Sequence, residues 1–325
     1  MSMILTVLAV LALLTAAILA GFHLQTRRLT KQGAELVPQI GKVQPVAGGA
    51  IHYVEAGDPE RQTLVLIHGL SGQLQHYTYA LMPELSRDFH VLALDRSGCG
   101  YSVRDSAELG ALTEQARMIR EFLDAQGVTN PVLVGHSLGG AVALAMALDC
   151  PHKTAALALL SPLTHPTPGT PPAFKALEIR TGWLRNLIGH TLAVPMARKT
   201  APQVLKAVFA PEPIPTDFLE RAGGALGLRP SAFITASQDV VAANAGIGPL
   251  AARYPQLAVG GAILFGAEDP IVSPASQGLP MRAYGLEVEQ LAGRGHMIPI
   301  TAPDDCAAFI RKVAATTRQP KIPAV

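Results

Sequence analysis

The sequence predicts an α/β fold in which helices cover both faces of a mostly parallel sheet. Short, continuous apolar runs alternate with segments whose apolar residues recur at helical spacing. Parallel strands are buried on both faces, so they read as continuous apolar runs. The chain is 49% hydrophobic and only 15% charged, which excludes a largely disordered protein.

The first predicted element is a membrane-spanning helix over residues 3–22. This segment has no charged side chain, and its only polar side chains are Thr6 and Thr15. As a helix, about 20 apolar residues cross the roughly 30 Å hydrocarbon core of a bilayer. The preceding residues carry no basic side chain, and the apolar run is longer than that of a secretory signal. An uncleaved anchor is therefore favoured over a cleaved signal peptide or a buried core helix.

Residues 23–42 are polar and charged, and they predict a linker between the membrane and a folded domain. Arg27, Arg28 and Lys31 follow the apolar segment at once. Basic residues collect on the cytoplasmic side of membrane spans. This cluster favours a cytoplasmic folded domain, although one short cluster leaves the side of the membrane open.

The region 43–160 predicts the first half of the sheet. Strands are expected at residues 50–55, 63–67, 90–94, 131–134 and 155–160. Helices are expected at residues 113–125, which have helical apolar spacing, and at residues 138–148, which are rich in small residues. This alternation is typical of parallel strands joined by helical crossovers.

The region 256–318 predicts the second half of the sheet, with strands at 261–265 and 286–291 and a last helix that begins near Pro303. Between the two halves, over residues 161–255, strand signals vanish and prolines separate short helical segments. A structureless loop of this length is rare in a compact domain. A helical cap inserted into one α/β unit is therefore expected, with Trp183, the only tryptophan, either in the cap core or in a substrate pocket.

Charge and cysteine content exclude several other classes of protein. A net charge of +2 without a dense basic cluster gives no reason to expect a nucleic-acid partner. Cys99, Cys150 and Cys306 lie far apart, so they predict neither a disulfide framework nor a zinc site. No metal or organic cofactor is expected, and the oligomeric state is left open.

The strongest chemical signal is the G-x-S-x-G motif of residues 135–139. It follows a predicted strand and opens a predicted helix, which is the context that a nucleophilic serine requires. The flanking glycines allow a sharp turn, so the Ser137 hydroxyl projects from the carboxyl end of the strand. The Leu138 N–H, at the helix N-terminus, is placed to donate to an oxyanion. An ordinary turn serine is the alternative.

Together with four further motifs, this turn resembles the α/β-hydrolase fold family, in its lid-bearing esterase, C–C-hydrolase and haloperoxidase-like branch. The further motifs are His68-Gly69, the loop D-R-S-G-C-G-Y-S of residues 95–102, Gly266-Ala267-Glu268-Asp269 and Gly293-Arg294-Gly295-His296. The resemblance covers roughly residues 43–160 and 260–315 and leaves the cap unmatched. It is specific for the fold and much less specific for the substrate.

The resemblance implies a triad in the order serine, acid, histidine. Asp269, just after the strand at 261–265, is the expected acid, with Glu268 and Asp239 as alternatives. His296 is the expected base, because an imidazole exchanges a proton near neutral pH. A surface histidine is the alternative reading of His296.

The resemblance also implies a second oxyanion donor, the N–H that follows His-Gly, which is that of Leu70. The His68 side chain is expected to be structural and to bond to its own loop. Asp95 is expected to fix its own turn rather than to take part in chemistry.

These residues predict a serine hydrolase that cleaves a carboxylic ester through an acyl-enzyme. The anchor and cap suggest a fairly lipophilic small-molecule ester, with the bilayer as a second partner. A C–C bond hydrolase of a β-diketone-like ring-cleavage product would use the same triad and stays open. A non-catalytic ligand-binding protein of this fold is the alternative from another class.

Overall fold

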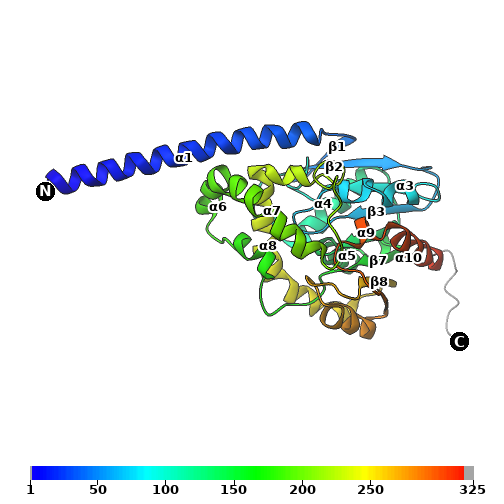
Figure 1. Ribbon diagram of the computed structural model, residues 1–325. Coiled ribbons are helices and arrows are strands. Elements are labelled where there is room, and N and C mark those ends of the chain that lie inside the picture. Colours follow the sequence, from blue (N-terminus) through cyan, green and yellow to red (C-terminus); the bar gives the residue numbers. More distant parts are fainter. Residues whose placement is uncertain (1, 318–325) are drawn as a thin grey trace, which may run out of the picture.

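The computed structural model describes residues 2–317 (Figure 1), so residue 318, the last of the predicted core, lies outside the described residues. The chain forms one twisted sheet with helices on both faces, a helical cap beside it and a long N-terminal helix that projects from the body.

The sheet has the strand order β1-β2-β4-β3-β6-β7-β8-β9, and β5 pairs with β2. Six neighbouring strands pair in parallel, in the order β4-β3-β6-β7-β8-β9. At one edge, β2 pairs antiparallel with β1, β4 and β5. Their bounds are β1 Lys42–Val46, β2 Gly49–Ala56, β3 Thr63–Ile67, β4 His90–Leu94, β5 Val103–Arg104, β6 Val132–His136, β7 Ala156–Leu160, β8 Gly261–Gly266 and β9 Leu286–Leu291. Every residue of β3, β4, β6 and β7 is buried, as expected for strands covered on both faces.

Two hydrophobic clusters occupy the two faces of the sheet. Alternate residues of β3 separate between them: Val65 and Ile67 pack with α4 and α5, while Leu64 and Leu66 pack with α3 and α10. The helices around the sheet are α2 Gln75–Thr78, α3 Leu81–Leu85, α4 Leu112–Ala125, α5 Leu138–Asp149, α9 Ile298–Thr301 and α10 Pro303–Thr316. The predicted mostly parallel α/β fold is therefore confirmed.

Helices fill the segment between β7 and β8. They include α6 Gly182–Ile188, α7 Val194–Phe209 and α8 Pro230–Ala251. Single turns of 3-10 or π helix occur here and elsewhere: η1 Glu108–Gly110, η2 Pro151–Lys153, η3 Pro172–Leu177, η4 Gly189–Ala193, η5 Gly224–Leu228, η6 Tyr254–Gln256, η7 Pro274–Gly278 and η8 Leu279–Tyr284. Helices α6, α7 and α8 form the cap, and contacts such as that of Asp239 on α8 with Arg96 after β4 place it at the carboxyl ends of the strands.

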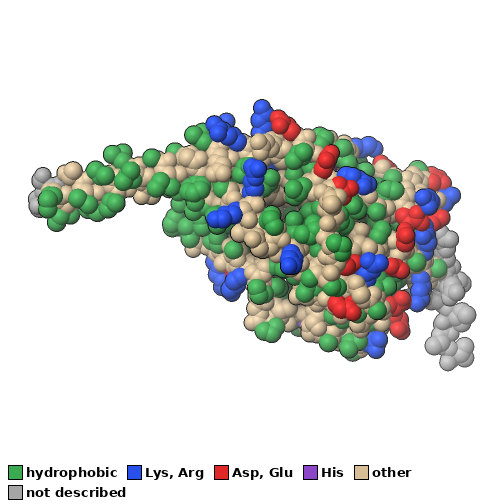
Figure 2. Space-filling view, in the orientation of Figure 1, with side chains coloured by type: hydrophobic (Ala, Val, Ile, Leu, Met, Phe, Trp, Pro, Cys, Tyr) green, Lys and Arg blue, Asp and Glu red, His purple; other side chains and the backbone are tan. Residues whose placement is uncertain are grey.

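The N-terminal helix α1, Ser2–Leu36, is long and apolar enough to cross a membrane. Its residues 3–18 are exposed, and its most apolar 18-residue window has a mean hydropathy of 2.8. Figure 2 shows hydrophobic side chains along the projecting part. The sequence therefore contains one candidate membrane span in its described part.

The region predicted as a linker, residues 23–42, differs from that expectation, because α1 continues without a break to Leu36. The Thr26 hydroxyl donates to the Thr191 carbonyl (2.8 Å), and the Thr30 hydroxyl donates to the Leu228 carbonyl (3.1 Å). A Cβ on Gly33 would lie 2.5 Å from the Ala225 carbonyl oxygen, so only glycine permits this close packing. Contacts with the cap hold these polar residues in a helix.

Candidate active site

Ser137 occupies a strained turn between β6 and α5. Its φ of 54° and ψ of −121° lie in a region that non-glycine residues rarely adopt. Such strain costs on the order of 1–3 kcal/mol and persists where the surroundings enforce it. A Cβ on Gly139 would lie 2.1 Å from the Ile67 carbonyl oxygen, so the glycine of the motif lets α5 pack against β3. The turn holds Ser137 at the carboxyl end of β6.

The two predicted oxyanion donors belong to Leu138 and Leu70, and both residues lie on segments next to this serine. Leu138 is the first residue of α5, where an N–H has no acceptor within the helix. Leu70 lies on the loop after β3, and a Cβ on the preceding Gly69 would lie only 2.8 Å from the Ser137 Cβ. The loop that carries Leu70 therefore runs directly beside the serine.

His296 and Asp269 are paired on the loops that follow β9 and β8. The His296 Nδ1–H donates to Asp269 Oδ2 at 2.8 Å, and both side chains are buried. The other oxygen, Asp269 Oδ1, accepts the N–H groups of Ile271 (2.8 Å) and Val272 (3.0 Å). These bonds fix the carboxylate and leave His296 Nε2 free of this pair, as a general base requires.

The turn that carries Ser137, called the elbow here, and the loop that carries His296, called the histidine loop, are in direct contact. The ring of His136, next to Ser137, lies 4.8 Å from the ring of His296, and its Nε2–H donates to the His296 carbonyl (3.0 Å). The structure thus brings the loops of Ser137, His296, Asp269 and Leu70 together at the carboxyl ends of four parallel strands.

The two alternative acids have other partners. Glu268 Oε2 accepts the Arg294 N–H at 3.1 Å. The Asp239 carboxylate is buried between Arg96 and Arg104. Among the described acids, Asp269 is the one paired with His296.

Three buried histidines near the site are held in the neutral form. Burial and the charge of Arg96 keep the pKa of His68 well below its usual range, and burial together with His296 does the same for His136. Burial lowers the pKa of His76 to about 4. His68 Nε2 accepts the Arg96 N–H and its Nδ1–H donates to the Gly69 carbonyl, so its predicted structural role agrees with these contacts.

Asp95 fixes its loop through a set of buried bonds. Its Oδ1 accepts the Leu74 N–H at 2.7 Å, and its Oδ2 accepts the Tyr101 N–H at 2.9 Å and the Nδ1–H of His52 at 2.7 Å. A Cβ on Gly100, where φ is +51°, would lie 2.0 Å from Asp95 Oδ2. Asp95 therefore fixes its own turn and also ties the segments of Leu74 and His52 to it.

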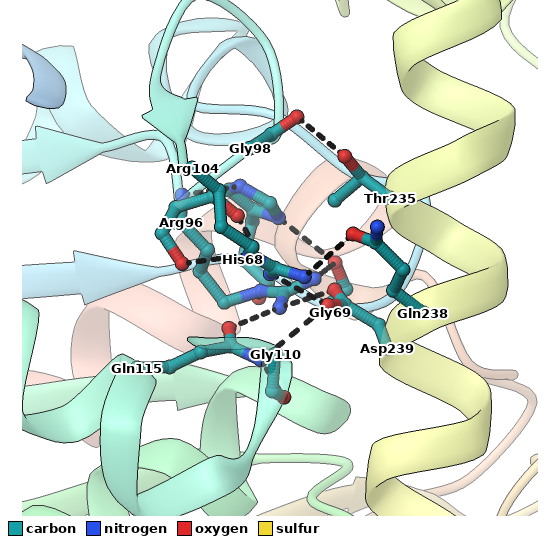
Figure 3. Close-up of polar contacts among 11 residues, drawn as sticks. His68, Gly69, Arg96, Gly98, Arg104, Gly110, Gln115, Thr235, Gln238 and Asp239 are labelled. Atoms are coloured by element: carbon teal, nitrogen blue, oxygen red, sulfur yellow. Dashed lines mark hydrogen bonds and ion pairs between the residues drawn. The ribbon is translucent and has the colours of Figure 1, made fainter. Parts of the chain in front are cut away.

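Sequence reasoning missed the role of Arg96, which follows β4 (Figure 3). Its Nε donates to the His68 carbonyl (2.9 Å), and its Nη2 donates to the Gly69 carbonyl (3.0 Å). Its Nη1 donates to Asp239 Oδ2 on cap helix α8 (2.7 Å) and to Gln115 Oε1 (2.6 Å). One fully buried guanidinium thus joins the cap to the peptide groups just before Leu70.

A second cap carboxylate holds the histidine loop. Glu212 Oε2 accepts the Gly295 N–H at 2.8 Å, and its Oε1 accepts from Arg294 Nη1 at 3.0 Å. A Cβ on Gly295 would lie 2.0 Å from the Ala210 carbonyl oxygen. The cap therefore contacts the Leu70 loop and the His296 loop through two acids, the buried Asp239 and the partly buried Glu212, that lack any local sequence signal.

A cavity of about 770 Å³ separates the cap from the core. Its lining is mostly apolar and includes Phe174, Leu177, Leu192 and Leu205 of the cap, together with Gln32 and Leu36 of α1. It reaches Ser71 and Gly72, which follow Leu70. Trp183 was expected in the cap core or the pocket, but its side chain is mostly exposed and outside this lining.

No group of three or more His, Cys, Asp or Glu side chains suited to a metal ion occurs among residues 2–317. The three cysteines are free and buried.

The chain is similar to known α/β hydrolases. A sequence model described as "Alpha/beta hydrolase family" matches residues 64–309. The dihydrolipoyllysine-residue acetyltransferase component of the acetoin cleaving system of Cupriavidus necator is 35% identical over 118 residues, which are 36% of this chain and 31% of that protein. The 2-hydroxy-6-oxo-2,4-heptadienoate hydrolase of Pseudomonas putida is 34% identical over 127 residues, which are 38% of this chain and 44% of that protein. The chain therefore spans less than half the length of these two relatives.

A solved structure extends the likeness to the whole fold. A membrane phospholipase A, described as a bacterial virulence factor, superposes with a TM-score of 0.68 at 23% identity. The superposition covers 98% of this chain and 100% of that one. With the family match spanning more than half of the sequence, and with the sheet, elbow and strand-end loops described above, the chain belongs to the α/β-hydrolase family.

Proposed function

We propose that this protein is a membrane-anchored serine hydrolase that cleaves a carboxylic ester. The observation that carries the proposal is the strained conformation of Ser137 at the end of β6, directly after His136, which donates to the His296 carbonyl. Strain of this kind collects at functional sites, where the surrounding structure enforces it. The buried pair of His296 and Asp269 supports the same reading.

The mechanism follows from these positions. His296 takes the Ser137 proton as the serine oxygen attacks the ester carbonyl carbon, and Asp269 stabilises the resulting imidazolium. The N–H groups of Leu70 and Leu138 donate to the tetrahedral oxyanion. The imidazolium then protonates the leaving alcohol, and an acyl-enzyme remains. Water, activated by His296, attacks the acyl-enzyme and releases the acid.

A fairly lipophilic ester fits the surroundings of this site. The cavity beside the Leu70 loop is walled mostly by apolar cap residues and by Gln32 and Leu36 of α1. We propose that α1 anchors the protein in a bilayer by a single span, with Arg27, Arg28 and Lys31 favouring a cytoplasmic body. The similarity of the full-length fold to a membrane phospholipase A supports the anchor.

C–C bond hydrolysis is the second candidate, and the similarity to 2-hydroxy-6-oxo-2,4-heptadienoate hydrolase favours it. The same serine and oxyanion donors would act on a ketone carbonyl, so the triad does not separate the two reactions. A non-catalytic binding protein would need no activated serine.

The full chain in detergent should be used for the test, because residues 26–36 of α1 pack against the cap and line the cavity. A chain-length series of p-nitrophenyl esters, with Ser137→Ala as control, should show turnover that rises with acyl length and vanishes in the variant. A fluorophosphonate should label only the wild-type protein. Absence of labelling in the folded wild type would favour a binding protein, and turnover of a vinylogous diketone but of no ester would favour C–C hydrolysis.

A further inference from the structure

Helix α6 presents an apolar face that the body leaves uncovered. The side chains of Trp183 and Leu187 are 70% and 42% exposed. They are four residues apart, so they share one side of the helix. Arg185 faces the other way, is buried, and donates to the Ile179 carbonyl (2.6 and 3.1 Å). Trp183 and Leu187, named here the α6 surface, are therefore held outward on a helix that is fixed from behind.

The α6 surface lies where the apolar part of α1 ends. The residues directly after α6 contact α1: the His23 Nδ1–H donates to the His190 carbonyl at 3.0 Å. Residues 3–22, which precede this contact, amount to about 30 Å of helix, the thickness of a hydrocarbon core. Figures 1 and 2 show α6 at the end of the body from which this part of α1 projects, with hydrophobic side chains gathered there. A bilayer crossed by α1 would thus begin beside α6.

The charge around the α6 surface suits an anionic lipid surface. Residues 178–211 contain five basic residues, of which Arg185 is buried, and one acidic residue, Glu178, which lies 4.0 Å from Arg180. Residues 3–34 contain three basic and no acidic residues. Arg180, Arg198 and Lys199 are exposed. Basic residues near a bilayer are attracted to anionic headgroups, and tryptophan favours the membrane–water interface. A second copy of the chain would bring the same positive charge, so the bilayer is the better occupant.

We propose that the α6 surface docks onto the lipid–water interface, with Trp183 at the level of the headgroups and upper acyl chains. The inference rests on the proposed membrane anchor. A single helix fixes the distance of the body from the bilayer, and a second contact at α6 fixes the tilt of the body as well. Docking would then hold the cap against the bilayer in one orientation.

Trp183 reports on this contact directly, because it is the only tryptophan of the chain. The full-length protein is reconstituted into vesicles of phosphatidylcholine and phosphatidylglycerol, and flotation measures its association with them. Quenching of tryptophan fluorescence by lipids brominated along the acyl chain is compared with quenching by aqueous acrylamide. We expect strong quenching by lipids brominated near the headgroup and weak quenching by acrylamide. Leu187→Glu should reverse this order, whereas Leu279→Glu, at a 40% exposed position away from α6, should not.

The outcomes separate docking from anchoring. A chain that floats with vesicles but whose Trp183 is quenched by acrylamide alone overturns the docking and leaves the anchor intact. A chain that does not float overturns the anchor and the docking with it. Protection of Trp183 that grows with protein density, at constant lipid composition and without quenching by brominated lipids, identifies a second copy as the occupant and also overturns the proposal.

Discussion

The guanidinium of Arg96 and the carboxylate of Asp239 form an ion pair of 2.7 Å that crosses from the core to the cap, and both side chains are fully buried. The same guanidinium binds the carbonyls of His68 and Gly69. The position of the Leu70 N–H thus depends on a residue of cap helix α8.

We expect Asp239→Asn to lower kcat more than it raises KM. The amide keeps the shape of the side chain but removes the charge that holds Arg96, and removing one partner of a buried ion pair costs about 3–5 kcal/mol of stability. Loosening one oxyanion donor should lower kcat by up to about 10²–10³-fold. Steady-state kinetics below the melting temperature of the variant measure the split. Glu289→Gln, at an exposed ion pair with Lys312, is the matched control, and an equal loss in kcat there would contradict the assignment.

Replacing Ser137 separates strain from chemistry. Ser137→Gly and Ser137→Ala should both abolish ester turnover. Because glycine adopts a positive φ without a steric penalty, the glycine variant should be more stable than the alanine variant by on the order of 1 kcal/mol, after the entropy cost of glycine is subtracted. Chemical denaturation of both variants measures the difference. Equal stabilities would show that the turn stores no strain.

Asp269→Asn should lower kcat by on the order of 10⁴-fold, because an amide no longer stabilises the imidazolium and favours the wrong tautomer. The neighbouring Glu268→Gln should retain most of the activity, since its carboxylate binds the Arg294 N–H and not His296. Ester turnover by the two variants tests the choice of acid. A larger loss of activity in Glu268→Gln than in Asp269→Asn would show that Glu268, and not Asp269, is the acid of the triad.

Stability should fall as the solution is acidified below about pH 6.5. Burial and the Arg96 charge lower the pKa of His68 in the folded state, and burial together with His296 lowers that of His136. The unfolded chain binds these protons at the usual value of about 6.5 and the folded chain does not, so each histidine costs up to about 1.4 kcal/mol per pH unit in this window. Above about pH 6.5, neither histidine makes stability depend on pH.

Denaturation at a series of pH values measures that slope. His136→Gln, whose amide can still donate to the His296 carbonyl, should reduce it. His152→Gln, at an exposed position, should leave it unchanged. A wild-type stability that is flat between pH 6.5 and 5 would contradict the neutral burial of these histidines.

Much of the fold was predictable because each central strand is a buried apolar run that stands out in the sequence. The edge strands β1 and β5 lack such a run, because Lys42–Val46 mixes polar and apolar residues and is mostly exposed, and Val103–Arg104 has only two residues. The polarity of residues 23–36 predicts a linker, although they form the second half of α1. The buried residues Thr26, Leu29 and Gly33, with Val37 just after the helix, do recur at helical spacing. Because two of these four residues are not apolar, they give no apolar stripe in the sequence.

For the proposed site, motifs predict that its core residues lie close together, but they do not predict the contribution of the cap. The predicted triad and oxyanion residues follow strands whose carboxyl ends meet at one edge, so local sequence indicates their proximity. Arg96 and Asp239 lie 143 positions apart, and no periodicity connects a core loop with a cap helix. Contacts of that kind depend on how the cap packs against the core, and local patterns in a single sequence do not predict this packing.

Because α1 is one continuous helix, it fixes the distance between its apolar N-terminal part and the body of the protein. From Phe22 to Gln32 and Leu36, which border the cavity, is about 15–21 Å of helix, so the height of the cavity over an anchored span is set by residue count. The rotation of the body about the axis of α1 is set as well. Inserting one residue near His23 would turn the span by about 100° relative to the body, and inserting seven residues would nearly restore the original orientation. The number of residues in this helix therefore determines both the distance and the orientation of the cavity relative to an anchored span.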